Sequence, residues 1–244
     1  MRRLARLIVL ACLLLPAMVL AVGRACAAPD IVYVYPDQSV WTTETDERGN
    51  PANPLLRLAK SLFAQTGLNW REEALPAARM FSSLKSGEAN FSMLVKAPAL
   101  QECCLFSRQP VAGTELRVYW RQGTAPITKR EDLAGKSLLV ILGYSYGDMA
   151  AFLADGKNAI HRTSAVKHQA AFEMLAQGRG DYLLDYAGPA REVLAARPIP
   201  GIQSAVLGRM DVHLVLSRQY PDADEVMNRL EAAAMKLGSV EQPP

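Results

Sequence analysis

The chain has 244 residues, half of them hydrophobic, and a formal net charge of +3 at neutral pH. Removing residues 1–27 takes away four arginines and no acidic residue, which leaves a net charge of −1. The basicity of the whole chain thus belongs to its N-terminus and gives no support to a nucleic-acid partner, so none is expected. The length suffices for one large domain or two small ones.

The N-terminus has the pattern of a secretory signal peptide. The basic stretch MRRLAR is followed by an apolar run over 7–22, and Ala25-Cys26-Ala27 supplies the small residues of a cleavage site. A membrane anchor is the alternative, but Pro16 interrupts a run that is already short for a spanning helix. We therefore predict that residues 1–27 are removed, that the protein is exported to the periplasm, and that it is not membrane-embedded after cleavage.

The first part of the remaining chain alternates strand and helix patterns. Residues 30–35 (DIVYVY) are rich in β-branched and aromatic residues, as expected of a buried strand. A helix is predicted next, from the N-cap Asn53 to the terminating Gly67, and a second helix over 76–87. Residues 89–95 (ANFSMLV) then form another strand. This order predicts an α/β domain with a largely parallel sheet.

The second part repeats the scheme. A strand is predicted over 137–142, followed by a helix from about Ser145, a helix from the N-cap Ser164 to Gly178, and a strand that begins at Asp181.

The two parts share one junction. LKSGEAN (84–90) and LAQGRGD (175–181) both read Leu-x-x-Gly-x-x-[Asn/Asp] and both precede a strand. A glycine can end a helix in the left-handed conformation, and a small polar residue then opens the strand. The Arg-Gly-Asp of the second junction is thus explained as part of a helix-to-strand turn, and the repetition predicts a two-lobed protein.

The cysteines and histidines predict no metal site. Outside the signal only Cys103 and Cys104 remain, too few for a closed zinc site. They are either two partly buried thiols or, in an oxidising compartment, a strained vicinal disulfide. His161, His168 and His213 have neither ligand spacing nor carboxylate companions in the sequence, so neither a metal nor another cofactor is expected.

Six segments in a fixed order carry a resemblance to a known family. They are LAKSLFAQTG (58–67), LKSGEAN (84–90), LFSRQPV (105–111), ITKREDLAGKSLLVILGYS (127–145), LAQGRGDYLLDY (175–186) and the segment 213–238. In this order they resemble the bacterial extracellular solute-binding proteins of family 3, the periplasmic receptors of polar amino-acid ABC transporters, of which the chain would be a divergent member.

The resemblance implies an α/β fold of the periplasmic-binding-protein type II class. Two lobes would be joined by two hinge crossovers, near 111–115 and 208–214, and a ligand cleft would lie between them. Lobe 1 would comprise 28–112 and 214–244, and lobe 2 would comprise 113–213. The implied function is capture of a small polar ligand by a monomer, for delivery to an ABC transporter permease.

The resemblance also assigns candidate ligand-binding residues. Asp185, beside Tyr186 at a strand end, would pair with a ligand ammonium, or else be a solvated loop acid. Ser145 would bind a ligand carboxylate and could also be the N-cap of the next helix. Trp41 would cover the ligand, or pack in the core.

One departure concerns the ligand. Family members usually carry an arginine before the Phe-Ser pair that clamps the ligand carboxylate, whereas LVKAPALQECCLFS offers only Lys96, which lacks the bidentate geometry of arginine. Arg79 is a substitute, unless it is an exposed helix arginine. The identity of the ligand therefore stays open.

Two other function classes remain as alternatives. One is a periplasmic sensor or accessory protein that works without a transporter. The other is an enzyme similar to the periplasmic cyclohexadienyl dehydratases of this fold. Because no Ser-His-Asp, Cys-His or paired-carboxylate pattern stands out, catalysis is not expected.

Overall fold

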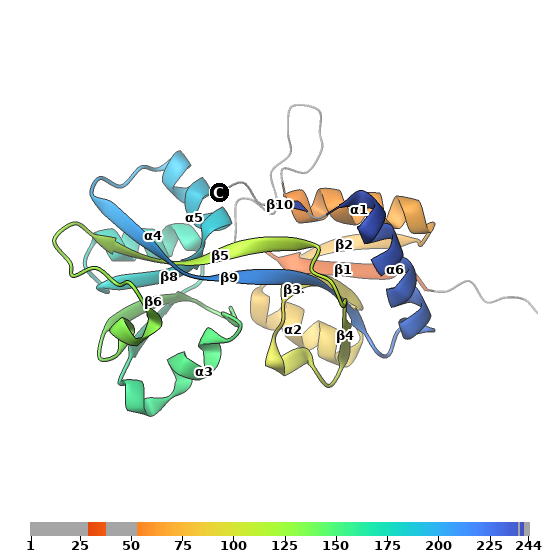
Figure 1. The fold of residues 1–244 in the computed structure, drawn as a ribbon, viewed down its shortest axis with the longest axis horizontal. Helices are drawn as coiled ribbons and strands as arrows, with labels where there is room; N and C mark the ends of the chain where they lie inside the picture. The colour runs from red at the N-terminus through yellow and green to blue at the C-terminus, as the bar shows by residue number, and fades with distance from the viewer. Residues whose placement is uncertain (1–28, 38–52, 239, 242–244) are drawn as a thin grey trace, which may run out of the picture.

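The computed structural model describes residues 29–37, 53–238 and 240–241. Trp41 and the predicted signal peptide lie outside these residues. No helix in these three ranges is long and apolar enough to cross a membrane. The described chain forms one mixed sheet with helices on its faces, in the strand order β2-β1-β3-β9-β5-β8-β6-β7 (Figure 1).

One end of the sheet is built from the first part of the chain. Strand β1 (Ile31–Pro36) lies between β2 (Trp70–Leu75) and β3 (Phe91–Val95), and all three are parallel. The crossovers between them contain α1 (Pro54–Thr66) and α2 (Ala77–Ser86).

The other end repeats this arrangement. Strand β6 (Ser137–Ile141) lies between β7 (His161–Ala165) and β8 (Tyr182–Tyr186), again in parallel. Helix α4 (His168–Ala176) connects β7 to β8, and α5 (Ala187–Ala196) follows β8 directly. The short helix α3 (Met149–Ala154) lies between β6 and β7 in the chain.

Two long antiparallel strands join the two ends. Strand β5 (Ala112–Arg121) pairs with β9 (Ile202–Ser217) along its length, with a register shift between Leu116 and Arg117. Strand β9 then pairs with β3, whereas β5 pairs with β8, so both strands run across the middle of the molecule (Figure 1).

Three further elements complete the sheet and its cover. Strand β4 (Cys104–Phe106) pairs with β9, and β10 (Val240–Glu241) pairs with β5. The last helix, α6 (Ala223–Leu237), returns to the first end of the sheet and packs beside α1 (Figure 1).

The buried hydrophobic side chains divide in the same way. Two clusters, which include Phe63, Phe91 and Leu216, draw only on residues up to 112 and from 212 onward. The other two, which include Leu138 and Phe172, draw on residues 116–193. Each parallel group of strands therefore has its own core, and β5 and β9 are the strands common to both ends.

The predicted helix caps of α1 are confirmed. The side-chain oxygen of Asn53 accepts hydrogen bonds from the backbone N–H groups of Leu55 and Leu56, at 2.9 and 3.4 Å. Gly67 follows the helix with φ +62°, the left-handed conformation that glycine adopts without a steric penalty.

The repeated junction is also confirmed. Gly87 and Gly178 have φ values of +80° and +75°. At the first junction the Asn90 side chain accepts a hydrogen bond from Val32 N at 2.7 Å and so joins β1 to β3. At the second, a methyl group on Gly180 would lie 2.6 Å from Leu139 Cγ, so the Arg-Gly-Asp segment packs tightly against β6.

Two sequence predictions were wrong in position, and two strands were missed. Ser164 lies in β7 rather than at a helix N-terminus, and α4 begins after Lys167. Ser145 is not an N-cap, because α3 begins only at Met149. Strands β2 and β7 were not predicted; each is at an edge of the sheet, β2 is partly and β7 largely exposed, and neither has the apolar pattern of a buried strand.

Candidate functional site

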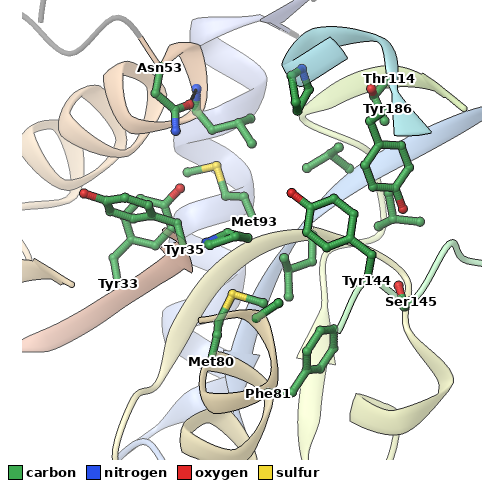
Figure 2. A pocket seen from close by; sticks show the side chains of 17 residues that line it. Tyr33, Tyr35, Asn53, Met80, Phe81, Met93, Thr114, Tyr144, Ser145 and Tyr186 are labelled. Atoms are coloured by element: carbon green, nitrogen blue, oxygen red, sulfur yellow. Dashed lines mark hydrogen bonds between the residues drawn. The ribbon is translucent and has the colours of Figure 1, made fainter. Parts of the chain in front are cut away.

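A cavity of about 130 Å³ lies between the two ends of the sheet. An apolar cavity of about 150 Å³ holds a benzene-sized molecule, so this volume suits a small ligand. Figure 2 shows Tyr33, Tyr35 and Asn53 on one side of the cavity, and Tyr144, Ser145 and Tyr186 on the other. The end of the sheet around β1 and the end around β6, called the first and second halves below, therefore both supply its walls.

The wall from the first half is aromatic and apolar. Tyr33 and Tyr35 lie two residues apart on β1 and so project to the same face of the sheet, with ring centroids 5.4 Å apart. Met80 and Phe81 of α2 and Met93 of β3 extend this wall. Side chains of this kind shape a small-molecule site and remove water from it.

The wall from the second half is formed at the carboxyl ends of two parallel strands. Tyr144 and Ser145 follow β6, and Tyr186 is the last residue of β8. The rings of Tyr144 and Tyr186 have centroids 5.5 Å apart and planes inclined by 32°. Loops at this edge of α/β sheets are the usual place for ligand sites.

A hydrogen-bonded chain runs behind this wall. Asp185 Oδ2 lies 2.7 Å from His168 Nδ1, and His168 Nε2 lies 2.9 Å from the Tyr144 hydroxyl. The second carboxylate oxygen accepts a hydrogen bond from Tyr186 N at 2.8 Å. Asp185 and His168 are 0% and 1% exposed, so the carboxylate is buried behind the cavity and is linked to the Tyr144 hydroxyl through His168.

The two halves touch beside the cavity. A methyl group on Gly143 would lie 3.0 Å from Ala77 Cβ and 3.1 Å from Ala78 N, at the start of α2. A methyl group on Gly147 would lie 3.1 Å from Val95 Cγ1. The loop after β6 therefore packs against the first half through glycines, whose lack of a side chain permits the close approach.

The described part of the chain contributes no charged side chain to the cavity lining. Burial, followed by the nearby Asp185 carboxylate, raises the pKa of Tyr144 and of Tyr186. Burial is also the main cause of the raised pKa of Tyr33. These phenols are therefore neutral at physiological pH. The Thr114 hydroxyl, on β5 at the cavity, has no hydrogen-bond partner among the described residues.

The sequence-predicted site residues fall into three groups. Ser145 and Tyr186 line the cavity. Asp185 lies behind it, fully buried, in contact with His168. Arg79, on α2, and Lys96, after β3, are exposed and are not lining residues. Trp41 lies outside the described residues. The roles of all six in binding stay predictions.

Sequence reasoning missed the three other tyrosines and the histidine of this site. Tyr33 and Tyr35 were counted only as β-formers in the first strand, although their spacing of two residues already placed them on one face. His168 was judged by its sequence neighbours, but its carboxylate partner is 17 positions away. Tyr144 was overlooked beside Ser145.

The described residues show no metal centre. No group of three or more potential metal ligands occurs in 29–37, 53–238 or 240–241. Cys103 and Cys104 are free thiols with their sulfur atoms 2.9 Å apart, and neither of them lines the cavity.

Neither a protein-family model nor a curated protein matches this sequence. Solved structures do match. A histidine kinase sensor domain with similarity to periplasmic binding proteins has a TM-score of 0.72 and 18% identity, over 86% of this chain and 91% of that one. An ancestral arginine-binding protein bound to arginine has a TM-score of 0.71 and 16% identity, over 86% and 93% of the two chains.

A further match is the holo form of ArgBP from T. maritima, with a TM-score of 0.68 and 20% identity, over 85% of this chain and 89% of that one. The arginine-, lysine- and histidine-binding protein ArtJ from Geobacillus stearothermophilus gives 0.67 and 17%, over 86% and 89%. At such identities the comparison establishes the fold. The chain has the α/β fold of periplasmic binding proteins, as its sequence predicted.

Proposed function

We propose that the protein is a periplasmic binding protein that captures one small ligand in the cavity between its halves. The observation that carries this proposal is the cavity itself, which takes Tyr33 and Tyr35 from one half and Tyr144, Ser145 and Tyr186 from the other. A ligand that contacts both walls binds only when the halves are together, so binding favours the closed arrangement.

The hinge of this closure would be the paired strands β5 and β9. They are the long connections between the two parallel groups, and the register shift at Leu116/Arg117 lies near the middle of their pairing. Lobe 1 would comprise 28–112 and 214–244, and lobe 2 would comprise 113–213. Bending a two-stranded ribbon leaves each lobe core intact, which permits closure by hinge motion.

Delivery of the bound ligand to an ABC transporter permease is the first candidate for the physiological role. The arginine-binding proteins and ArtJ, which share this fold and bind amino acids, support a solute-binding role. The predicted signal peptide supports a periplasmic location, where such a monomer would meet a permease. No catalytic step is proposed, since these similar structures are described as binding proteins.

Ligand sensing is the second candidate. The histidine kinase sensor domain matches with a TM-score of 0.72, and in a sensor the closed state would be read by another protein instead of a permease. A measurement of ligand uptake distinguishes delivery to a permease from sensing. Deleting the gene should abolish high-affinity uptake of the radiolabelled ligand if the protein delivers it, and should leave uptake unchanged if the protein only senses it.

A thermal-shift screen of the processed protein tests the binding function. The screen would contain amino acids, small carboxylates, polyamines, small amines and neutral alcohols. A ligand at 100 times its Kd stabilises the folded state by about 2.7 kcal/mol, which is a readily measured rise in Tm. We expect at least one compound to raise Tm with a saturable dose response. If no compound of any class does so, the proposal is wrong.

A further inference from the structure

The walls of the cavity are poorly suited to a ligand carboxylate. Among the described residues that line it, the polar side chains carry hydroxyls or the Asn53 amide, and none carries a positive charge. A buried carboxylate without a cationic partner or several hydrogen-bond donors is strongly disfavoured. Arg79 and Lys96, the cations considered from the sequence, are exposed and are not part of the lining.

The same walls are well suited to a positive charge. Four tyrosine rings line the cavity, Tyr33 and Tyr35 from one half, Tyr144 and Tyr186 from the other. An aromatic ring attracts a cation placed over its face, and the attraction is strongest where water is excluded. Rings on opposite walls can surround a compact cation as the halves close.

Among the described residues, the carboxylates that raise the pKa values of these tyrosines lie close enough to act on them. The Asp185 carboxylate contributes to the raised pKa of both Tyr144 and Tyr186, after burial, and Asp37 adds to the effect on Tyr144. Glu72 acts in the same direction on Tyr33 and Tyr35, again after burial. The field at the cavity walls from these residues favours a cation over an anion.

The hydrogen-bonded chain connects the buried charge to the cavity. If His168 Nδ1 carries the proton that is donated to Asp185, Nε2 accepts the proton of the Tyr144 hydroxyl. The Tyr144 oxygen then keeps its lone pairs for a donor in the cavity. Asp185 thus acts on a ligand from behind, through His168 and Tyr144, and not by direct contact.

We propose that the ligand is a compact organic cation without a carboxylate, held among the tyrosine rings with the Tyr144 oxygen as its hydrogen-bond acceptor. This inference rests on the proposed binding function and narrows its ligand class. It departs from the α-amino acids bound by the arginine-binding proteins of the same fold.

A set of three matched probes tests it by isothermal titration calorimetry on the processed protein. Choline carries a trimethylammonium cation, and 3,3-dimethylbutan-1-ol is its uncharged carbon isostere. Glycine betaine has the same trimethylammonium group together with a carboxylate. We expect choline to bind at least about tenfold more tightly than the isostere, as a desolvated cation–π interaction implies, and more tightly than glycine betaine.

Two variants and a control separate the cation effect from loss of structure. Tyr186→Leu should weaken choline binding at least about tenfold, whereas Tyr186→Phe, which keeps the ring, should nearly retain it. Asp185→Asn should weaken the binding of choline more than that of the isostere, because the removed negative charge attracts only the cation. Tyr182→Phe, which loses only a hydrogen bond to Ala125 O outside the cavity, should bind choline like the original protein.

The outcomes distinguish this inference from the proposed function. Isostere binding equal to choline, or glycine betaine binding tighter than choline, would overturn the cation assignment while the binding function stands. Absence of choline binding at about 10 mM, a concentration above the Kd of weak ligands, overturns the cation assignment as well. The binding function is then decided separately by the broader thermal-shift screen.

Discussion

Asp185 and His168 form a buried pair in which a carboxylate oxygen lies 2.7 Å from an imidazole nitrogen and neither side chain is more than 1% exposed. His168 also contacts the Tyr144 hydroxyl, so three side chains from the loop after β6, the start of α4 and the end of β8 are joined. The pair therefore lies directly behind the cavity wall and supports the lining residue Tyr144.

Replacing His168 with leucine tests the structural part of this role. The variant leaves the Asp185 carboxylate buried and without its imidazole partner, and breaking a buried pair in this way costs about 3–5 kcal/mol. We expect urea denaturation to show a loss in unfolding free energy of that size. The control His161→Leu replaces an exposed histidine on β7 and should change stability by less than about 0.5 kcal/mol. Equal effects from the two variants would contradict a stabilising role for the pair.

Adding a methyl group at Gly143 should weaken ligand binding. Gly143 has φ +84° and touches Ala77 of the other half, so an alanine there obstructs the approach of the halves. Gly123→Ala is the matched control, because Gly123 has φ +86° and nothing within 4 Å of the added methyl group. Both variants lose about 1–2 kcal/mol of stability from the left-handed conformation. Only Gly143→Ala should also raise the Kd of a ligand found in the screen.

The two cysteines should differ in reactivity. Burial, together with the contact to Cys103, raises the pKa of Cys104 to about 12, so almost no thiolate forms at pH 8. We expect iodoacetamide at pH 8 to modify Cys103 first, with Cys104 modified only after unfolding in urea. Peptide mapping by mass spectrometry measures both sites. Modification of Cys104 at the rate of Cys103 in the folded protein would contradict the burial.

Mild acid should destabilise the protein through His213. Burial lowers the pKa of His213 below its ordinary value and Lys96 adds to the effect, although the hydrogen bond with Ser107 O and the charge of Asp211 oppose it. A lowered pKa means that the unfolded chain binds a proton first as the pH falls, so stability is full above about pH 6.5 and is lost below it. The urea concentration at the unfolding midpoint should decrease as the pH is lowered from 7.5 to 5.5. The decrease should be smaller in His213→Gln. An unchanged pH dependence in that variant would exclude His213 as a cause.

The elements that the sequence predicted are those with strong local signals. Helix α1 has an Asn53 cap, a proline start and a Gly67 stop, and β1 and β8 are largely buried runs of mostly aliphatic and aromatic residues. Strands β2 and β7 were missed because edge strands face solvent and carry charged or polar side chains. Their position is fixed by pairing with β1 and β6, which no local pattern reports.

The site was harder to predict than the fold. Ser145 and Tyr186 line the cavity, and the resemblance to the solute-binding family had pointed to both. The burial of Asp185 could not be inferred, because it depends on His168, which only the packing of α4 against β8 brings within reach. A carboxylate at a strand end suggests direct contact with a ligand, whereas here the carboxylate is buried and contacts His168.

The most direct test of the proposed binding site is a substitution that fills the cavity. Ser145→Trp places a large side chain in the lining, and Asp148→Trp places the same side chain at an exposed position of the same loop. Calorimetric titration with the tightest ligand from the screen should show a loss in affinity of about a hundredfold or more for Ser145→Trp, as expected when a ligand is displaced from its pocket, and an unchanged Kd for Asp148→Trp. If a folded Ser145→Trp variant, with its melting temperature preserved, binds the ligand as tightly as the original protein does, the cavity between the halves is not the binding site.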